Sequence, residues 1–355
     1  MDTVKRLQPS VRELSSKDPT TRSDAAKDLA VIVKEHHLYP ISLVQLDGVK
    51  PLIKLLSAKE KDVKGGMERA NAALALGYFA KSSNKHREAV VAAGGLGPLV
   101  RMLDSDRAVE RCQASFAVAQ LCEDDARAQS IAVRLNAVHH LVRELSLESG
   151  AVSNAAYALA VLCGKMQVQS EIGRIGAAEP LVQYLSAPNA AERIDAAHCL
   201  SKLAKGNAEN QARILEAGVV EPLMALLSSS LSGEKHNAAM ALTSICDGFE
   251  PAQTAFVEAG ALEVMIQALP KQSAEQRQAI VALGAMARGN VDNAAAIVEA
   301  GCMDILLQQL RSCASAERGE AAVTLANLAE MNEEAEDALK KPGAFVAVKR
   351  ELGLL

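Results

Sequence analysis

Amide and carboxylate side chains recur along the chain at a nearly constant spacing of about 42 residues. Residues of these types donate and accept hydrogen bonds, so a row of them could hold the N–H and C=O groups of an extended peptide. Early in a helix, the same side chains also bond the backbone of neighbouring turns or of an adjacent helix. The sequence leaves both interpretations open. This set, the polar row, comprises Asp24, Asn71, Gln113, Asn154, Asp195, Asn237, Gln278 and Glu320.

The residue types that usually perform catalysis show no such organisation. The sequence contains no glycine-rich phosphate loop, no HExxH or GxSxG motif and no cysteine–histidine constellation. The adjacent pairs His36–His37 and His139–His140 cannot share a helical face and make poor metal sites. We therefore expect no catalytic residues, no metal site, no cofactor and no enzyme activity.

The seven cysteines form no CxxC pair. Cys122, Cys163 and Cys246 share one position of the period, which other copies fill with alanine. A position that alternates between alanine and cysteine indicates a small buried slot, so reduced core thiols are expected rather than disulfides or ligands.

A repeated segment explains the spacing. Its clearest copy is Glu216–Leu227, EAGVVEPLMALL, with related copies at 93–100, 175–182 and 258–265. A period of 40 to 47 residues between copies indicates stacked helical repeats. The position of Gly218 is expected to separate two helices with a left-handed turn, which glycine adopts without strain and Asn or Asp tolerates. This hinge position holds Asp47, Gly94, Asn136, Gly176, Gly218, Gly260, Gly301 and Gly343.

Each repeat is expected to contain two short helices and a long third one. Around Gly218 these would span 208–217, 220–227 and 234–246, with helices at 4–14 and 23–34 in the opening unit and at 344–352 in the last. We expect a single solenoid over residues 1–355, made of an N-terminal cap repeat at 1–46, seven repeats at 47–342 and a partial repeat at 343–355.

Composition narrows the class of protein. Apolar residues make up 49% of the chain but aromatic residues only 3%, which predicts a core of Ala, Leu, Val and Ile. A net charge of −5 provides no basic field for nucleic acid. No apolar run approaches the roughly 18 residues that span a bilayer. We expect a cytoplasmic protein without membrane insertion, with the nucleus as the alternative location.

The EAGxxxPLxxLL-type segments and the ALAxL-like ends of the third helices, such as AVTLANLA at 322–329, resemble the armadillo-repeat family over essentially the whole chain. The resemblance implies an all-α, right-handed superhelical solenoid of about eight three-helix repeats. Family members such as importin alpha and beta-catenin bind extended peptides along a concave groove lined by the third helices. The polar row then maps to this groove.

The resemblance places two further sets of equivalent positions, here called columns, on the third helices. The family's asparagine ladder is matched only by Asn327, with Gln120 as an amide substitute and Tyr78 and Lys202 at other copies. The column that holds Trp in nuclear-import receptors contains Phe116, Tyr157 and His198, and the chain has no Trp. A nuclear-import receptor is therefore disfavoured. The partner-binding candidates are Asn71, Tyr78, Gln113, Phe116, Gln120, Asn154, Tyr157, Asp195, His198, Lys202, Asn237, Gln278 and Asn327.

Two charged columns precede the polar row. Glutamates stand at 68, 110, 192, 234, 275 and 317, where the helix dipole favours them, and each next position is Arg, Lys or Gln, with Arg22 in the opening unit. We expect Glu–Arg pairs between successive repeats, here named the ladder, rather than a basic stripe for nucleic acid.

These features predict a scaffold or adaptor that binds a protein segment, either an extended peptide or a helix, in the concave groove. Two alternatives remain. The chain could be a regulatory module for a small GTPase or a ubiquitin ligase, or a structural array in a cytoskeletal or axonemal assembly. The sequence does not identify the partner or the oligomeric state.

Overall fold

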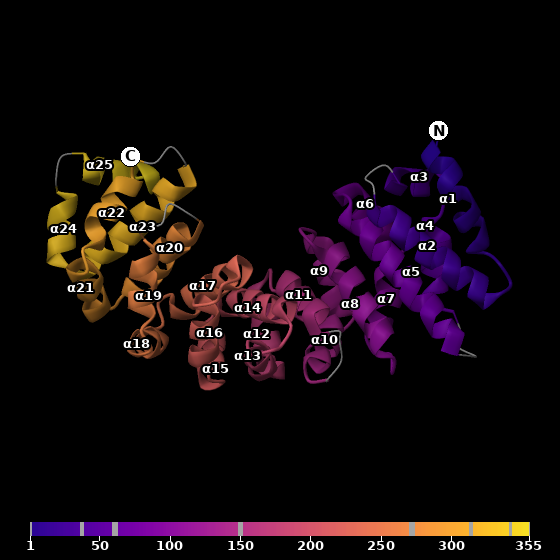
Figure 1. The fold of residues 1–355 in the computed structure, drawn as a ribbon, viewed down its shortest axis with the longest axis horizontal. Coiled ribbons are helices and arrows are strands. Elements are labelled where there is room, and N and C mark those ends of the chain that lie inside the picture. Colours follow the sequence, from indigo (N-terminus) through magenta and orange to yellow (C-terminus); the bar gives the residue numbers. More distant parts are fainter. Residues whose placement is uncertain are drawn as a thin grey trace. The chain divides into compact units, whose positions relative to one another are not determined.

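In a computed structural model, the protein is described over residues 2–35, 39–58, 63–147, 152–269, 274–311, 315–340 and 343–354. These residues form 25 helices connected by short turns (Figure 1). The chain divides into two compact units, Met1–Ala177 and Ala178–Leu355. The expected all-α class and the succession of two short helices and one long helix are confirmed, whereas the handedness of the superhelix and the domain boundaries stay predictions.

The first unit contains four long third helices that pack consecutively against one another. They are α2 (Pro19–Glu35), α5 (Val63–Lys81), α8 (Ala108–Cys122) and α11 (Val152–Leu162). The first helices of its repeats are α3 (Tyr39–Gln45), α6 (Asn84–Ala92), α9 (Ala126–Arg134) and α12 (Met166–Ile175). The second helices are α4 (Val49–Leu55), α7 (Leu96–Met102) and α10 (Ala137–Leu145), and α1 (Asp2–Glu13) takes that place in the cap.

The second unit repeats this arrangement. Its third helices, which also pack consecutively, are α14 (Ala190–Ala204), α17 (Ser232–Cys246), α20 (Ala274–Ala287) and α23 (Ser315–Met331). The first helices are α15 (Ala208–Glu216), α18 (Glu250–Glu258), α21 (Val291–Glu299) and α24 (Glu333–Leu339). The second helices are α13 (Ala178–Tyr184), α16 (Val220–Leu227), α19 (Ala261–Ala268), α22 (Cys302–Gln309) and α25 (Ala344–Glu351).

The core is built from small aliphatic residues of the third helices. Alanine and leucine dominate the fully buried positions, and Phe79 and Phe256 are the largest side chains among them. Small residues allow the long helices to approach closely, as at Gly77, where an added Cβ would lie 2.5 Å from the Phe116 ring. The expected aliphatic core is confirmed.

The described cysteines are free thiols, as expected. Cys122, Cys163, Cys199, Cys246 and Cys302 are buried and Cys112 is half-buried. Burial raises the pKa of Cys122 to about 12, so this thiol stays protonated at neutral pH. Cys313 and the pair His36–His37 lie outside the described residues.

The hinge prediction is confirmed at every copy. Gly94, Gly176, Gly218, Gly260, Gly301 and Gly343 have φ between 76° and 98°, and Asp47 and Asn136 have φ of 51° and 69°. The structure adds a second set of left-handed positions that the sequence analysis missed. They lie where a third helix turns into the next first helix, at Asp124, Gly206, Gly248 and Gly289.

Gly218→Val should lower the free energy of unfolding by about 1–2 kcal/mol, because a side chain with a Cβ is strained at a φ of +79°. No atom lies within 4 Å of a Cβ built there, so the cost comes from the backbone alone. Gly218→Asn is the matched control and should cost less, since Asn136 adopts this conformation at the equivalent hinge. Urea unfolding of the three proteins measures the difference, and equal midpoints for the valine and asparagine variants would contradict it.

Buried amides of the first helices tie consecutive helices together. Gln253 is 1% exposed and donates to the carbonyls of Cys246, Ala285 and Arg288 at 3.0 Å each. Asn210 and Asn293 make the same bond to Leu203 and Met286, at 3.0 Å. These amides satisfy the carbonyls at the ends of the third helices. Gln129 and Gln169 do likewise for Cys122 and Cys163.

Candidate functional site

The third helices carry the partner-binding candidates in every repeat. Most of these side chains are half-buried, whereas Asn71 and Gln120 are buried at 8% and 4% exposure. Within each unit, the candidates lie on helices that pack directly against each other.

The polar row uses much of its hydrogen-bonding capacity inside the protein. Asn71 donates to the carbonyl and hydroxyl oxygens of Ser23 on the preceding third helix, both at 3.1 Å. Asn154 donates to the carbonyl of Cys112 at 3.3 Å in the same way. The structural interpretation of the row is therefore confirmed at these two positions, and ligand binding by the row stays a prediction.

The remaining members of the polar row differ from one another. Asn237 donates to the carbonyl of Gly233 in its own helix at 2.8 Å. Glu320 accepts from Arg277 through both carboxylate oxygens at 2.7–2.9 Å. Gln113 and Asp195 are half-buried and Asp24 is exposed. Gln278 borders a cavity between repeats.

The asparagine-ladder column is also partly structural. Asn327 donates to the carbonyl of Gly284 on the preceding third helix at 2.9 Å. Ser244 lies 3.2 Å from the hydroxyl of Ser201 on α14. The buried side-chain carbonyl oxygen of Gln120 has no hydrogen-bond partner among the described residues. Lys202 is half-buried.

Three aromatic side chains form the most distinct feature of the first unit. Tyr78 on α5 and Phe116 on α8 meet edge to face with ring centroids 5.1 Å apart. The ammonium of Lys34 lies over the Tyr78 ring, 5.4 Å from its centroid. Tyr157 on α11 donates its hydroxyl proton to Glu123 at 3.0 Å. All three rings are half-buried, in contrast to the fully buried Phe79. We name Tyr78, Phe116 and Tyr157 the aromatic row.

The column of Phe116 and Tyr157 begins with a histidine in the second unit. His198 continues the column and is half-buried. Burial lowers the pKa of His198, and the electrostatic effects of the neighbouring Lys202 and His236 side chains lower it further. A hydrogen bond with Asn237 opposes these effects without reversing them. His198 is therefore mostly neutral at pH 7, where it can donate one hydrogen bond and accept another.

The ladder is confirmed at three pairs and corrected elsewhere. Arg22 binds Glu68 at 2.6 and 3.1 Å, and Arg69 binds Glu110 at 2.6 and 3.1 Å. Arg193 binds Glu234, with Nε–Oε1 at 2.8 Å. The glutamates of these pairs are at most 3% exposed. The side chains of Glu275 and Glu317 lie outside the described residues.

Two arginines of the ladder pair with glutamates outside the expected column. Arg111 pairs with Glu144 of α10, because the next repeat has Ala151 at the glutamate position. Arg318 pairs with Glu351 of α25 at 2.8 Å. Arg111 and Arg193 also donate to carbonyls that precede their own helices, those of Ser105 and of Ala187 and Pro188. The column is thus a set of inter-repeat clamps and not a free basic stripe.

Within the part of the chain that the structure describes, no three His, Cys, Asp or Glu side chains gather as a metal site would require. The described helices also include none that is long and apolar enough to cross a membrane.

The sequence matches no protein-family model and none of the curated proteins. Among solved structures, it is similar to the crystal structure of an engineered protein, with 32% identity and a TM-score of 0.81 over 99% of this chain and 87% of that chain. It is also similar to a designed armadillo repeat protein, with 26% identity and a TM-score of 0.60 over 67% of this chain and 99% of that one. A second designed armadillo repeat protein, solved in complex with the peptide (KR)4, is 24% identical with a TM-score of 0.58 over the same shares.

Proposed function

Since the chain belongs to the armadillo-repeat family, we propose that it is a non-enzymatic scaffold or adaptor that binds an extended protein segment along its third helices. The aromatic row carries this proposal. Its three half-buried rings stand on consecutive third helices of a protein that is only 3% aromatic. Tyrosine and phenylalanine on a surface of this kind supply contact area at little entropic cost when a partner covers them.

The neighbours of the aromatic row favour a polar, extended ligand. Lys34 and Glu123 place charges of both signs beside the rings. The polar row runs alongside, where Gln113 is half-buried and Asn71 and Asn154 already donate to the preceding third helix. Amides of this kind bind peptide backbone without regard to side-chain identity, so the rings would provide most of the selectivity.

The peptide is not expected to be strongly basic. The designed relative crystallised with (KR)4 binds a peptide of alternating cations. In this chain Lys27 lies in the column of Phe116 and Tyr157, and Lys202 lies in the asparagine-ladder column, while the polar row contributes Asp24 and Asp195, and Glu320 of that row is already paired with Arg277. The columns thus present charges of both signs, and like charges across an interface weaken binding, so a segment without a strong net charge is favoured. Buried free thiols fit a reducing compartment, and we propose the cytoplasm.

A selection from randomised 12-residue peptides displayed on phage tests the proposal. The chain contains no Trp and four Tyr, of which Tyr78 and Tyr157 belong to the aromatic row. A Tyr39→Phe, Tyr184→Phe variant therefore reports on the row alone through its tyrosine fluorescence. Selected peptides free of aromatic residues should bind one to one and change that fluorescence. Peptides that bind without changing it, or a selection that enriches none, would contradict the proposal.

A further inference from the structure

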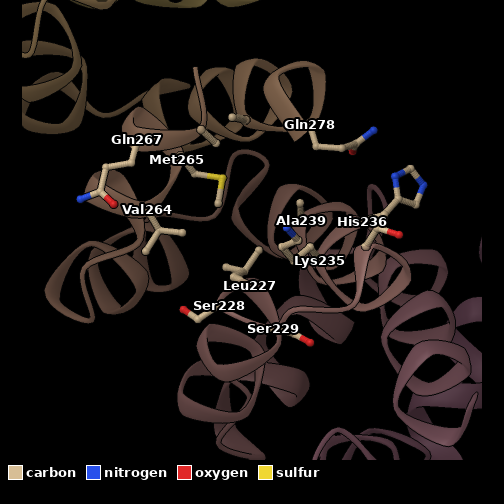
Figure 2. Close-up of a pocket in the computed structure, with 13 residues that line it drawn as sticks. Leu227, Ser228, Ser229, Lys235, His236, Ala239, Val264, Met265, Gln267 and Gln278 are labelled. Atoms are coloured by element: carbon tan, nitrogen blue, oxygen red, sulfur yellow. The ribbon is translucent and has the colours of Figure 1, made fainter. Parts of the chain in front are cut away.

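A cavity of about 300 Å³ lies between two consecutive repeats of the second unit. Its walls come from α16, α17, α19 and α20, and Figure 2 shows Leu227 and Lys235 facing Met265 across the space. Leu227, Met265 and Ala279 are buried core residues at its floor. The volume is at the lower end of the range for small-ligand pockets, and it suits one side chain of a partner.

The repeat that lines the cavity differs from the others by an alanine at position 268. Ala268, the last residue of α19, is one of the lining residues. The equivalent position, eight residues after the hinge, holds a larger side chain in the other repeats, namely Leu55, Met102, Glu144, Tyr184, Leu226 and Gln309. Four of these are at most 5% exposed. The smaller side chain leaves more room at this position, and a depression also borders Met102 at the equivalent position of the first unit.

The lining combines an apolar floor with donors at the rim. Leu227, Ala239, Val264 and Met265 provide carbon surface, and the hydroxyls of Ser228 and Ser232 and the amides of Gln267 and Gln278 surround it, whereas the Ser229 hydroxyl donates to Glu234. Lys235 and His236 are the ionisable groups among the 13 lining residues, and none of the 13 is acidic. Lys235 occupies the position at which Arg22, Arg69, Arg111 and Arg193 form the ladder. An ammonium has three donors and can hold a carboxylate in addition to a protein partner.

The corresponding depression in the first unit has a different chemistry. It lies between α4 and α7, beside Arg69 and Glu110. Its rim contains Arg101 and Arg107 but also Asp104 and Asp106, so charges of both signs balance one another. The described lining of the cavity at Ala268 combines an apolar floor with Lys235, His236 and serine hydroxyls at the rim, and the side chain of Glu275, the expected ladder partner of Lys235, lies outside the described residues.

We infer that this cavity binds the C-terminal residue of a partner peptide, with an apolar side chain on the floor and the free carboxylate at Lys235. The apolar wall requires a side chain such as that of leucine. The cation and the hydroxyls require a negatively charged, hydrogen-bond-accepting group within a few ångströms of that side chain, which a C-terminal residue provides. Gln267 and Gln278 at the rim can bond the preceding peptide group. The site is in the second unit, and its occupancy does not depend on the aromatic row of the first.

Methyl NMR of protein labelled with ¹³C at the methionine methyl groups tests the inference. The probes are N-acetyl-Gly-Ala-Leu with a free carboxylate, the same peptide as its C-terminal amide, and 4-methylpentanoate. The Met265 signal, assigned with Met265→Leu, should shift on addition of the free acid. The amide should bind at least tenfold more weakly, and 4-methylpentanoate should also bind more weakly because it lacks the peptide groups that Gln267 and Gln278 would bond.

Two variants complete the test. Ala268→Met inserts the residue that stands at the equivalent position 102, so it should be folded, at least as stable as the parent and unable to bind the acid. Lys235→Gln should weaken binding of the acid about tenfold and leave that of the amide unchanged. Met102→Ala opens the same position over the mixed-charge rim and should create no site.

The outcomes separate the explanations. Equal binding of acid and amide, or unchanged binding to Ala268→Met, would overturn the inference. Equal or tighter binding of 4-methylpentanoate would overturn the peptide as the source of the carboxylate. A silent Met265 signal with every probe would show that the cavity is a packing vacancy without a ligand. In each case the aromatic row retains its own test.

Discussion

Glu234→Ala should lower the free energy of unfolding by about 3 kcal/mol, because it removes the buried partner of a charged group. Glu234 is 3% exposed and accepts hydrogen bonds from Arg193 of the preceding third helix and from the Ser229 hydroxyl. The alanine leaves Arg193 with only the carbonyls of Ala187 and Pro188. Urea unfolding of the full chain measures the loss.

Glu192→Ala is the matched control. Glu192 occupies the same column in α14 but is half-buried and forms no ion pair with a described residue. Its replacement should change the stability by about 0.5 kcal/mol or less. A double-mutant cycle with Arg193→Ala isolates the pair. A coupling near zero, or equal losses for the two glutamates, would show that the ladder does not stabilise the stack of repeats.

The contribution of Glu234 should also depend on pH. Burial by itself would raise the pKa of Glu234, but the hydrogen bond from Ser229 and the pairing with Arg193 outweigh it, and the folded-state pKa lies below the ordinary 4.5. The stabilisation is therefore complete above pH about 4.5 and is lost as the pH falls through the lower, folded-state value. The gap between the parent and Glu234→Ala should be constant from pH 6 to 8 and narrow in acid. A gap that widens in acid would contradict the assignment.

The hinges could be predicted from the sequence because their cause is local. A left-handed backbone restricts the residue type at that position, so the series from Asp47 to Gly343 appears directly as Gly, Asn and Asp. The second left-handed set was visible by the same logic at Gly206, Gly248 and Gly289. The flanking sequence recurs as well, since KGNAEN around Gly206 returns as RGNVDN around Gly289.

Side-chain partners could be predicted only where both members recur at the period. The Arg22–Glu68 and Arg69–Glu110 pairs follow from the columns. The pairing of Arg111 with Glu144 does not, because it replaces a missing glutamate by one from another helix and depends on the three-dimensional packing. Asn71 shows the same limit. The sequence did not distinguish a structural from a ligand-binding role for this side chain, and its hydrogen bond to Ser23 is seen only once the two helices are packed together.

The cavity at Ala268 could not be predicted from composition or motif. An alanine at the end of a short helix is unremarkable in an alanine-rich protein. The space beside it becomes apparent only when the neighbouring repeat is placed, because residues of that repeat line the other side.

A Phe116→Ala, Tyr157→Ala double variant should bind a peptide selected on the parent protein at least 30-fold more weakly, which corresponds to about 2 kcal/mol. The two rings are half-buried in the free protein, on adjacent third helices. A docked peptide would remove the rest of their surface from water, and that gain disappears with the rings. Fluorescence polarisation of a labelled peptide measures the affinity.

The stability of the double variant decides what the rings do in the free protein. Truncating a fully buried Phe costs about 3–5 kcal/mol, and Phe79, next to Tyr78 on α5 but fully buried, serves as that reference. Phe79→Ala should therefore lose far more stability than either ring of the row, and retain the peptide affinity as long as it is folded. Tyr157→Phe removes only the hydroxyl bonded to Glu123 and should retain most of the affinity.

The comparison between Phe79 and the aromatic row distinguishes a binding surface from core packing. If the double variant unfolds as readily as Phe79→Ala, the rings of Phe116 and Tyr157 act as core residues that pack against small residues such as Gly77. If it is folded and binds the peptide with parental affinity, the partner docks elsewhere on the repeats. We expect a folded variant that no longer binds the peptide. In the free protein Phe116 packs against Tyr78 and Tyr157 bonds Glu123, and these contacts keep both rings in place while part of their surface is exposed.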